Sequence, residues 1–367
     1  MKKLINTYKD KKVVVTGHSG FKGSWLSIWL HLLGAEVLGI SDKIISKPSH
    51  YSSAQLEKII KTSWIDITDT NRIVKTISKF NPDIIFHLAA QPLVYSSFQN
   101  PVDTYKINSI GTTNILESIR CLQKRVVGVM ITSDKVYENF EWTWGYREND
   151  IIGGKDPYSA SKGMAELAIK GYVDSFFNSS GNNKIIGVAR AGNVIGGGDW
   201  AANRIVPDCV KAWSKGNVVN IRNPNSTRPW QHVLEPLSGY LSLGRFLSKK
   251  KSQDGTAYNF GPHADQDNSV ANLINEMSKN WKNVKWKNTF VKKSNIKESG
   301  LLKLNCDKSL SALNWKPVLS FEETVSMTTK WYKNYYDNKS KTTLEFSKLQ
   351  LEEYINLAKK RKVDWAQ

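Results

Sequence analysis

The stretch VVVTGHSGFKG at residues 13–23 decides the fold. It begins with three valines, which are typical of a buried strand, and an apolar helical pattern follows from Ser24. A strand that enters a glycine turn at a helix N-terminus forms a cradle for a dinucleotide pyrophosphate, because glycine permits tight turns and helix N–H groups attract anions. The alternative is a purely conformational turn. The residues predicted to contact the dinucleotide are Gly17, Ser19, Gly20, Phe21 and Gly23.

A second motif, YSASK at residues 158–162, places Tyr158 and Lys162 one helical turn apart on one face. A lysine charge beside a phenol lowers the phenol pKa from its usual value near ~10 and makes it a base. Each motif alone is common by chance. Their order, with a parallel-sheet pattern between them, supports a catalytic pair that also contacts the dinucleotide.

Strands and helices alternate through the first half of the chain, which predicts an α/β fold with a Rossmann-type doubly wound parallel sheet. After about Ala191 the pattern changes to loops rich in Gly, Asn, Pro and Trp, which indicates a smaller C-terminal substrate-binding lobe. We therefore predict a dinucleotide-binding domain at 1–190 with some later returning segments. The substrate lobe is expected at 191–335, and a basic helical extension at 336–367.

The predicted strand ends carry further candidates for the dinucleotide site. Asp42 follows the second strand, where an acid normally holds the adenosine ribose, and Lys43 beside it suits a 2′-phosphate. NAD is favoured over NADP, and a plain turn at Asp42 is the alternative. Asp66 and Ile67 end another strand and are expected at the adenine edge. Leu88, Ala89 and Ala90 follow a further strand and are expected where the backbone passes close to the cofactor.

The strand expected at 126–132 delivers Ser133, Asp134 and Lys135 to the carboxyl end of the sheet. One alternative is a polar turn without a chemical role. The chemical interpretation is a hydrogen-bond donor, an acid and a base arranged around one substrate. We predict that these three residues are catalytic.

Composition excludes several classes of protein. The 367 residues are 40% hydrophobic and 23% charged, which is typical of a globular chain, and no apolar run approaches the ~20 residues that span a bilayer. Three scattered cysteines lack metal or disulfide spacing, and the start of the chain lacks a signal-peptide pattern, so we expect a cytoplasmic protein without a metal site. About half of the net charge of +19 lies in 279–367 among acidic residues. This charge suits an anionic nucleotide substrate, and we predict no nucleic-acid or membrane partner.

The motifs together resemble the extended short-chain dehydrogenase/reductase family of nucleotide-sugar enzymes over about residues 10–330. Within that family the chain is most similar to the CDP-glucose 4,6-dehydratases. Dehydratases of dTDP- or GDP-sugars carry Asp-Glu where this chain has Asp134 and Lys135. The similarity rests on TGHSGFKGSWL, HLAAQPLV, TSDKVYEN, GGKDPYSASKGMAEL, RAGNVIGGGDW and RPWQHVLEPLSGYL.

This resemblance implies roles for the predicted residues. Tyr158, aided by Lys162, would take the proton from the sugar O4 while C4 gives a hydride to NAD. Lys135 would then remove the C5 proton, Asp134 would protonate the leaving O6, and the hydride would return to C6. Ser133 would hydrogen-bond the O4 oxyanion. The product would be a CDP-4-keto-6-deoxy sugar.

The resemblance also implies how the CDP-linked hexose is held. Asn193 and Arg228 match the family's pyrophosphate ligands, and Arg204 is a second arginine candidate whose alternative is a surface ion pair. The tryptophans are expected mostly in packing roles. The resemblance suggests a homodimer or higher homo-oligomer that pairs through helices near 103–121 and 158–176. A nucleotide-sugar 4-epimerase, a dehydratase of another nucleotide sugar and a non-catalytic NAD(P)-binding regulator are the alternatives.

Overall fold

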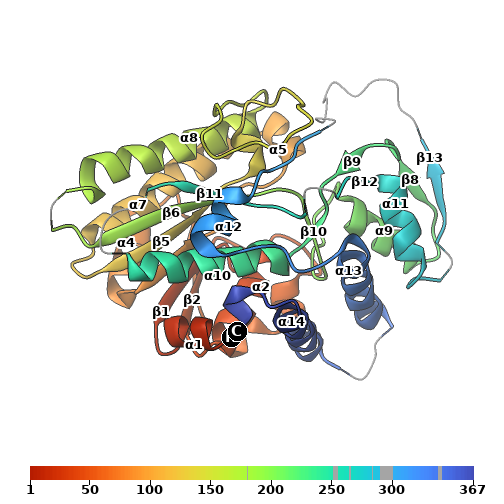
Figure 1. Ribbon diagram of the computed structural model, residues 1–367, viewed down its shortest axis with the longest axis horizontal. Coiled ribbons are helices and arrows are strands. Elements are labelled where there is room, and N and C mark those ends of the chain that lie inside the picture. The colour runs from red at the N-terminus through yellow and green to blue at the C-terminus, as the bar shows by residue number, and fades with distance from the viewer. Residues whose placement is uncertain (180, 251–254, 264–265, 283, 290–300, 338–340) are drawn as a thin grey trace.

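A seven-stranded parallel sheet forms the centre of the molecule, with helices on both faces (Figure 1). The computed structural model describes residues 1–179, 181–250, 255–263, 266–282, 284–289, 301–337 and 341–367. The strand order is β3-β2-β1-β4-β5-β6-β11, so the winding direction reverses between β1 and β4. The predicted doubly wound parallel sheet is confirmed. Its strands are β1 (Lys12–Thr16), β2 (Glu36–Ser41), β3 (Lys61–Trp64), β4 (Ile84–His87), β5 (Val126–Ile131), β6 (Lys184–Ala191) and β11 (Ala257–Phe260).

The three valines of β1 show why this strand is apolar throughout. Side chains alternate between the two faces of a strand, and here Val14 enters one core while Val13 and Val15 enter the other. All three side chains are fully buried. Burial of such a side chain contributes about 1.5–3 kcal/mol. A strand covered on both faces therefore needs an unbroken apolar run.

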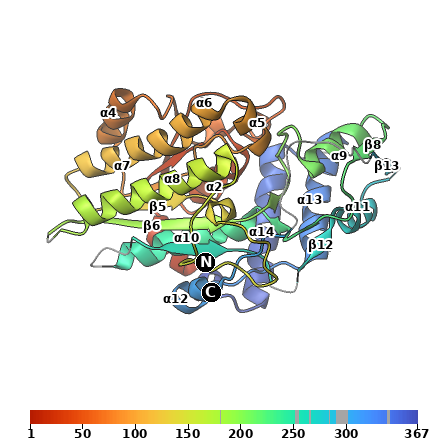
Figure 2. The same cartoon turned by 90° about the horizontal axis from the view of Figure 1, so that it is seen from above.

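Helices from different parts of the chain cover the two faces (Figures 1 and 2). One face carries α4 (Thr70–Phe80), α7 (Gly111–Cys121) and α8 (Pro157–Tyr172). The opposite face carries α1 (Lys2–Tyr8), α2 (Phe21–Leu32) and α10 (Leu234–Lys249). The structure also contains shorter helices: α3 (His50–Ser53), η1 (Leu56–Lys58), α5 (Val94–Gln99), α6 (Pro101–Tyr105), η3 (Asp134–Val136), α12 (Asp307–Leu313) and η5 (Asp364–Ala366).

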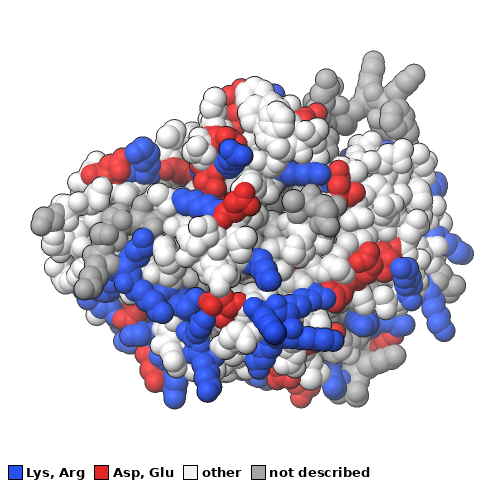
Figure 3. Space-filling model, in the orientation of Figure 1, with Lys and Arg blue, Asp and Glu red and all other residues white. Residues whose placement is uncertain are grey.

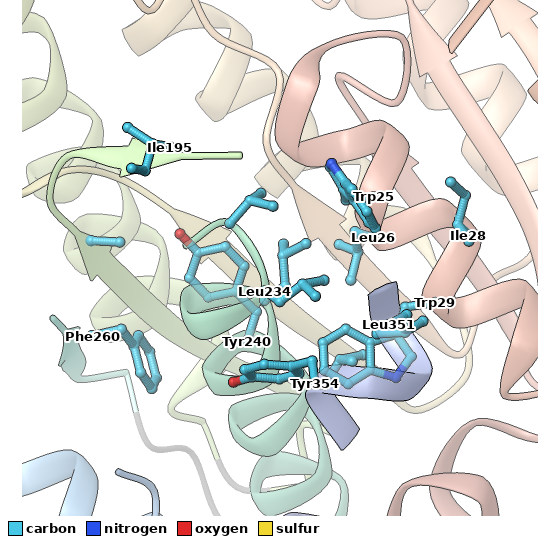
Figure 4. Close-up of a cluster of buried hydrophobic side chains, with 14 of the residues drawn as sticks. Trp25, Leu26, Ile28, Trp29, Ile195, Leu234, Tyr240, Phe260, Leu351 and Tyr354 are labelled. Atoms are coloured by element: carbon cyan, nitrogen blue, oxygen red, sulfur yellow. The ribbon is translucent and has the colours of Figure 1, made fainter. Parts of the chain in front are cut away.

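Buried aromatic side chains join α2 to α10 and to the C-terminal helix α14 (Thr343–Lys360) (Figure 4). The rings of Trp29 and Tyr354 meet edge to face with centroids 6.0 Å apart. Tyr354 in turn stacks on Trp365 at 5.5 Å. The C-terminal residues therefore cover α2 and support the helix that follows the glycine turn.

A smaller lobe extends beyond the carboxyl end of β6 (Figure 1). Its centre is aromatic, because Trp200 packs against Trp331, Tyr332 and Tyr335. The predicted boundaries of the two lobes stay a prediction, and several residues within 191–335 and 336–367 lie outside the described part of the chain. The elements of this region are β7 (Val194–Ile195), α9 (Ile205–Trp213), β8 (Val219–Ile221), β9 (Thr227–Arg228), β10 (Gln231–His232), β12 (Asn268–Ser269), α11 (Val270–Ser278), β13 (Trp286–Asn288) and α13 (Phe321–Tyr336).

The structure differs from the sequence-based expectation in the helix at 103–121. A π-helical turn, η2 (Lys106–Ile110), interrupts that helix, and a second one, η4 (Val173–Phe177), ends the helix expected at 158–176. The wide turn of η2 directs the buried Asn108 amide toward Ser161, whose hydroxyl accepts a hydrogen bond at 2.8 Å. Side-chain hydrogen bonds between distant segments are not visible in hydrophobic periodicity.

Lysine and arginine side chains gather on the lower part of the face in Figure 3, where Figure 1 places α1, α10 and α14. Acidic side chains are scattered among them. Several of the basic residues form ion pairs, such as Lys3 and Arg245 with Asp364. Among the described residues, none of the helices is both long and apolar enough to cross a membrane.

A buried carboxyl group fixes α10 to the C-terminal segments. Glu235 accepts hydrogen bonds from the backbone N–H groups of Val318 and Leu319, at 2.9 and 2.6 Å, and from the Tyr354 hydroxyl at 2.8 Å. Burial raises the pKa of Glu235 to about 7, although these three donors oppose the shift. The folded protein therefore holds a proton on Glu235 that the unfolded chain releases at lower pH.

This difference predicts a pH dependence of stability. The pKa of Glu235 rises from 4.5 to about 7 on folding, so the free energy of unfolding falls as the pH rises through that window. The shift corresponds to roughly 3 kcal/mol. In denaturant titrations between pH 5 and 8, the free energy of unfolding of the wild type should fall relative to that of Glu235→Gln, because all other titrating groups contribute equally to both proteins. Glu36→Gln is the control. Lys61 lowers the pKa of Glu36, so the contribution of Glu36 to stability changes with pH only below this window. Parallel pH curves for wild type and Glu235→Gln would contradict the prediction.

Candidate active site

The glycine turn after β1 lies at the point where the strand order reverses. Gly17 has a φ of +74°, and a Cβ on it would lie 2.8 Å from the backbone nitrogen of Ala89, which follows β4. A Cβ on Gly23 would lie 2.1 Å from the Gly17 carbonyl oxygen. Both positions therefore require glycine for reasons of protein packing. Gly20 differs, because its φ is −80° and a Cβ there would meet no atom closer than 3.3 Å.

The N-terminus of α2 is suited to an anion. Within the described part of the chain, no side chain caps this helix, so the N–H groups of its first turn are available to a ligand. Phe21 begins the helix, and its ring lies next to Gly196 of the second lobe. An uncapped helix N-terminus beside an open glycine fits the pyrophosphate of a dinucleotide. The structure thus places the predicted cradle residues together.

The segment after β2 forms the edge of this cradle. The Ser19 hydroxyl donates a hydrogen bond to the Lys43 carbonyl at 2.7 Å, so it fastens the glycine turn to that segment. Asp42 is half-exposed, and its carboxylate lies 3.6 Å from the Lys43 ammonium. An ion pair this exposed is weak, and either side chain is free to turn toward a ribose. The ribose-binding role of Asp42 stays a prediction.

The residues that follow β3 and β4 form the opposite side of the cradle. Leu88, Ala89 and Ala90 are half-buried, and the Thr16 hydroxyl accepts from the backbone N–H groups of Leu88 and Ala89, both at 3.1 Å. Asp66 is exposed and accepts from the N–H of Thr68, and the carbonyl of the buried Ile67 accepts from the Asn114 amide. These contacts position the two loops, and their role in binding adenine stays a prediction.

The turn that carries the three predicted catalytic residues, here called the catalytic turn, lies at the end of β5. Ser133 and Asp134 are buried, and the Ser133 hydroxyl donates to the Asp134 carboxylate at 3.0 Å. Lys135 is half-buried on the same short helix η3, and its backbone N–H bonds the Ser133 hydroxyl. Gly192, which follows β6, allows close approach, since a Cβ there would lie 3.1 Å from Asp134. The turn therefore presents its three polar residues where β5 and β6 end.

Tyr158 and Lys162 occupy the first half of α8, and both are buried. Burial raises the pKa of Tyr158 to about 12, and a hydrogen bond with Ser133 and the charge of Arg204 oppose this shift. Burial lowers the pKa of Lys162 to about 8, with Glu166 opposing. The expectation that Lys162 lowers the pKa of Tyr158 is therefore not met in the protein alone, because desolvation dominates.

Lys22 is a site residue that sequence reasoning missed. It stands on α2 inside the glycine motif, and its ammonium lies 3.4 Å from the Tyr240 hydroxyl. Burial lowers its pKa to about 7, the charges of Arg204 and Lys162 lower it further, and the charge of Asp134 opposes the shift. Its position in the motif was visible, but its direction toward the catalytic turn depends on the packing of α2 against α10.

The structure places the predicted substrate ligands in different surroundings. Arg204 lies at the start of α9, pairs with Asp199 at 2.8 Å and acts electrostatically on Tyr158, so it reaches the catalytic cluster. Asn193 is half-buried just beyond β6. Arg228 lies on β9 and donates to the Thr227 carbonyl at 2.7 Å. The latter two remain predicted substrate ligands.

Trp200 and Trp230, which lie in the stretches RAGNVIGGGDW and RPWQHVLEPLSGYL, are packing residues in this structure. Trp200 is buried, and its indole N–H donates to the Tyr336 hydroxyl at 3.2 Å. Trp230 is also buried and donates to the Asn268 carbonyl at 3.0 Å. Both side chains therefore fix loops of the second lobe.

Comparisons with known proteins agree with this geometry. A family model described as GDP-mannose 4,6 dehydratase matches residues 14–328. The CDP-glucose 4,6-dehydratase of Salmonella typhimurium is 40% identical over 354 residues, which cover 96% of this chain and 98% of that protein. The UDP-glucose 4-epimerase of Mycoplasma pneumoniae is 22% identical over 338 residues, covering 89% of this chain and 98% of the epimerase.

Solved structures share the fold at lower identity. An epimerase from Methanothermobacter thermautotrophicus superposes with a TM-score of 0.78 at 23% identity, covering 92% of this chain and 96% of its own. The dTDP-glucose 4,6-dehydratase of Bacillus anthracis, solved in complex with NAD, gives 0.71 at 18% identity, covering 88% and 97%. With a family model that matches most of its length and a relative 40% identical from end to end, this chain belongs to the GDP-mannose 4,6 dehydratase family of nucleotide-sugar enzymes.

Proposed function

We propose that this protein is a hydro-lyase that converts CDP-glucose to CDP-4-keto-6-deoxyglucose with NAD as its cofactor. The observation that carries the proposal is the Asp134-Lys135 pair on η3, in which Asp134 is buried and Lys135 half-buried beside the helix that bears Tyr158 and Lys162. The Salmonella relative supports the substrate, because its similarity spans nearly the whole of both chains. The NAD-bound dehydratase structure supports the cofactor.

The residues around the glycine turn fit the cofactor. NAD, when bound, takes up a hydride from C4 of the sugar and returns it to C6. Gly20 would lie against the pyrophosphate, and the N-terminus of α2 would meet its negative charge. Asp42 would hold the adenosine ribose.

Tyr158 and Lys162 would carry out the first half of the reaction. Tyr158 would accept the proton of O4, and Ser133 would donate a hydrogen bond to that oxygen as negative charge develops. The pKa of Tyr158 is raised by burial, so phenolate formation needs nearby positive charge. Lys162 and Arg204 are the cations of this chain placed to supply it.

Asp134 and Lys135 would carry out the second half. A 4-keto group acidifies the C5–H bond, and Lys135 would remove that proton while Asp134 protonates the leaving O6. A 4-epimerase exchanges a hydride at C4 alone and needs neither of these groups. The buried acid beside a lysine therefore favours dehydration over epimerisation, although solved epimerases share the fold.

The substrate lobe would hold the nucleotide end of CDP-glucose. Arg204, Arg228 and Asn193 are the expected ligands of its pyrophosphate, and guanidinium groups match paired phosphate oxygens. The cluster of Lys22, Lys162 and Arg204 gives this region a positive potential, which attracts an anionic substrate.

A homodimer through the outer faces of α8 and its neighbours is part of the proposal. Exposed apolar side chains line these elements: Val102, Ile110, Met164 and Leu167, with exposed fractions of 76%, 52%, 46% and 62%. Contiguous exposed apolar residues mark interaction surfaces. We also place the protein in the cytoplasm, where the free thiols of Cys121, Cys209 and Cys306 would stay reduced.

Substrate choice is the first test of this function. We expect kcat/KM for CDP-glucose to exceed those for dTDP-, UDP- and GDP-linked hexoses by at least ~10-fold, in the range that differences in pocket contacts give. Formation of a 4-keto-6-deoxy product is measured for each nucleotide sugar. Equal turnover of dTDP-glucose would refute the assignment of substrate.

The cofactor cradle is tested at its open glycine. Gly20→Ala should fold, because the new Cβ meets no atom closer than 3.3 Å, but it should weaken NAD binding by at least ~10-fold through contact with the pyrophosphate. Calorimetric titration with NAD measures this effect. Gly171→Ala on α8 is the matched control, since its Cβ would meet nothing within 4 Å. Unchanged NAD affinity in Gly20→Ala would exclude this cradle.

The elimination base is tested with Lys135→Met, which removes the amine and keeps most of the stem. Oxidation at C4 should persist while product formation falls by at least ~10²-fold, the usual loss when a general base is removed. Reduced nicotinamide should then accumulate on the enzyme, and its absorbance measures it. Lys155→Met is the control, because the Lys155 ammonium donates a hydrogen bond to the Asn139 carbonyl at an exposed position after η3. Wild-type product release by Lys135→Met would place the base elsewhere.

A further inference from the structure

A buried ion pair lies behind the two catalytic segments. Arg190 on β6 and Glu166 on α8 form a bidentate pair, in which Arg190 Nε donates to Glu166 Oε1 at 2.8 Å and Arg190 Nη2 donates to Glu166 Oε2. The side chains are 3% and 6% exposed. A buried charge pair is costly to desolvate unless its remaining hydrogen-bonding groups are also satisfied. The other partners of this pair therefore show what it holds in place.

Glu166 holds the upstream end of the catalytic turn. Its Oε1 accepts a hydrogen bond at 2.6 Å from the hydroxyl of Thr132, the residue directly before Ser133. Glu166 also stands one helical turn after Lys162 on α8, and its charge acts on that lysine. One carboxylate thus contacts the segment before the catalytic turn and belongs to the helix of the oxidation pair.

Arg190 holds the downstream end. Its Nη1 donates to the hydroxyl of Tyr137 at 2.7 Å and to the Glu148 carbonyl at 3.0 Å. The guanidinium also lies over the Tyr137 ring, 4.7 Å from its centroid. The Tyr137 hydroxyl donates in turn to Asn259 on β11 at 2.8 Å. Tyr137 is the first residue after η3, so the end of the catalytic turn is fixed to two strands.

The four residues between these anchors include Ser133, Asp134 and Lys135. We propose that Glu166 and Arg190 are a positioning pair that acts through Thr132 and Tyr137 to set Asp134 and Lys135 against Tyr158 and Lys162. This inference rests on the proposed function and deepens it. The elimination acid and base belong to a short turn held at its two ends, whereas the oxidation pair belongs to a regular helix.

The two half-reactions should therefore respond differently to loss of an anchor. Elimination needs a base at C5 and an acid at O6 at the same time, and a displacement of about 1 Å in such an arrangement costs about 10²-fold in rate. Oxidation at C4 depends on Tyr158 and Lys162, whose separation is fixed by α8, and on one hydrogen bond from Ser133, the residue next to the Thr132 anchor. Loosening Tyr137 displaces the elimination groups, whereas Tyr158 and Lys162 stay on α8 and Ser133 stays next to the intact Thr132 anchor.

Tyr137→Phe tests this inference, because it removes the hydroxyl and keeps the ring under Arg190. With CDP-glucose and NAD, we expect reduced nicotinamide to form within ~3-fold of the wild-type rate and 4-keto-6-deoxy product to form at least ~10-fold more slowly. Reduced nicotinamide should therefore accumulate in this variant. Tyr146→Phe is the matched control. Its ring stacks on Tyr137 at 5.2 Å, but its hydroxyl bonds Phe140 and Asn139, so both rates should stay at wild-type values.

Thr132→Val probes the other anchor and serves if Tyr137→Phe does not fold. It displaces Ser133 as well, so oxidation should slow in this variant, but elimination should slow more and reduced nicotinamide should still accumulate. Equal slowing of both half-reactions in these variants, or no change in either, would overturn the positioning role. Product formation by the wild type distinguishes a failure of the proposed function from a failure of the positioning role. Absence of product from the wild type would overturn the proposed function and this inference with it, whereas wild-type turnover with unchanged variants would overturn this inference alone.

Discussion

Close backbone contact between the turn after β1 and the start of the loop after β4 is the constraint on which the site depends. The contact exists because Gly17 lacks a Cβ, which would lie 2.8 Å from Ala89, and because Gly23 lets α2 lie directly on that turn. A side chain at either position would separate β1, β4 and α2, and the crevice at the reversal of strand order would lose its floor. The positions of the proposed dinucleotide cradle and of the proposed catalytic residues at the neighbouring strand ends both follow from this packing.

Exclusion of water is the second property that defines the site. Burial raises the pKa of Tyr158 to about 12 and lowers those of Lys162 and Lys22 to about 8 and 7. Each shift disfavours the charged form, so Tyr158 is held as a neutral phenol and the two lysines lose part of their charge. An anion bound beside Lys162 and Lys22 would restore that charge. A cluster with more cations than anions is matched to an anionic nucleotide sugar. The same low polarity strengthens every hydrogen bond that Ser133 and Asp134 make.

Local motifs were sufficient to predict much of this arrangement. The patterns that predict the parallel sheet, the glycine turn and the YSASK helix are each local in the sequence, and the structure places Ser133 and Arg204 close enough to act on Tyr158. Features that depend on packing between distant segments escaped prediction. The ion pair of Glu166 with Arg190 joins a helix to a strand. The π-helical turn η2 contains Asn108, whose amide donates a hydrogen bond to Ser161 on another helix.

The central claim is that one site joins oxidation at C4 to elimination across C5 and C6. The most direct measurement is the fate of hydrogen when CDP-glucose labelled with deuterium at C4 is converted, and when unlabelled substrate is converted in heavy water. The account predicts that the C4 deuterium moves to C6 and that solvent deuterium enters at C5. A product that keeps its label at C4 with inverted configuration, and that carries no solvent deuterium at C5, would contradict it.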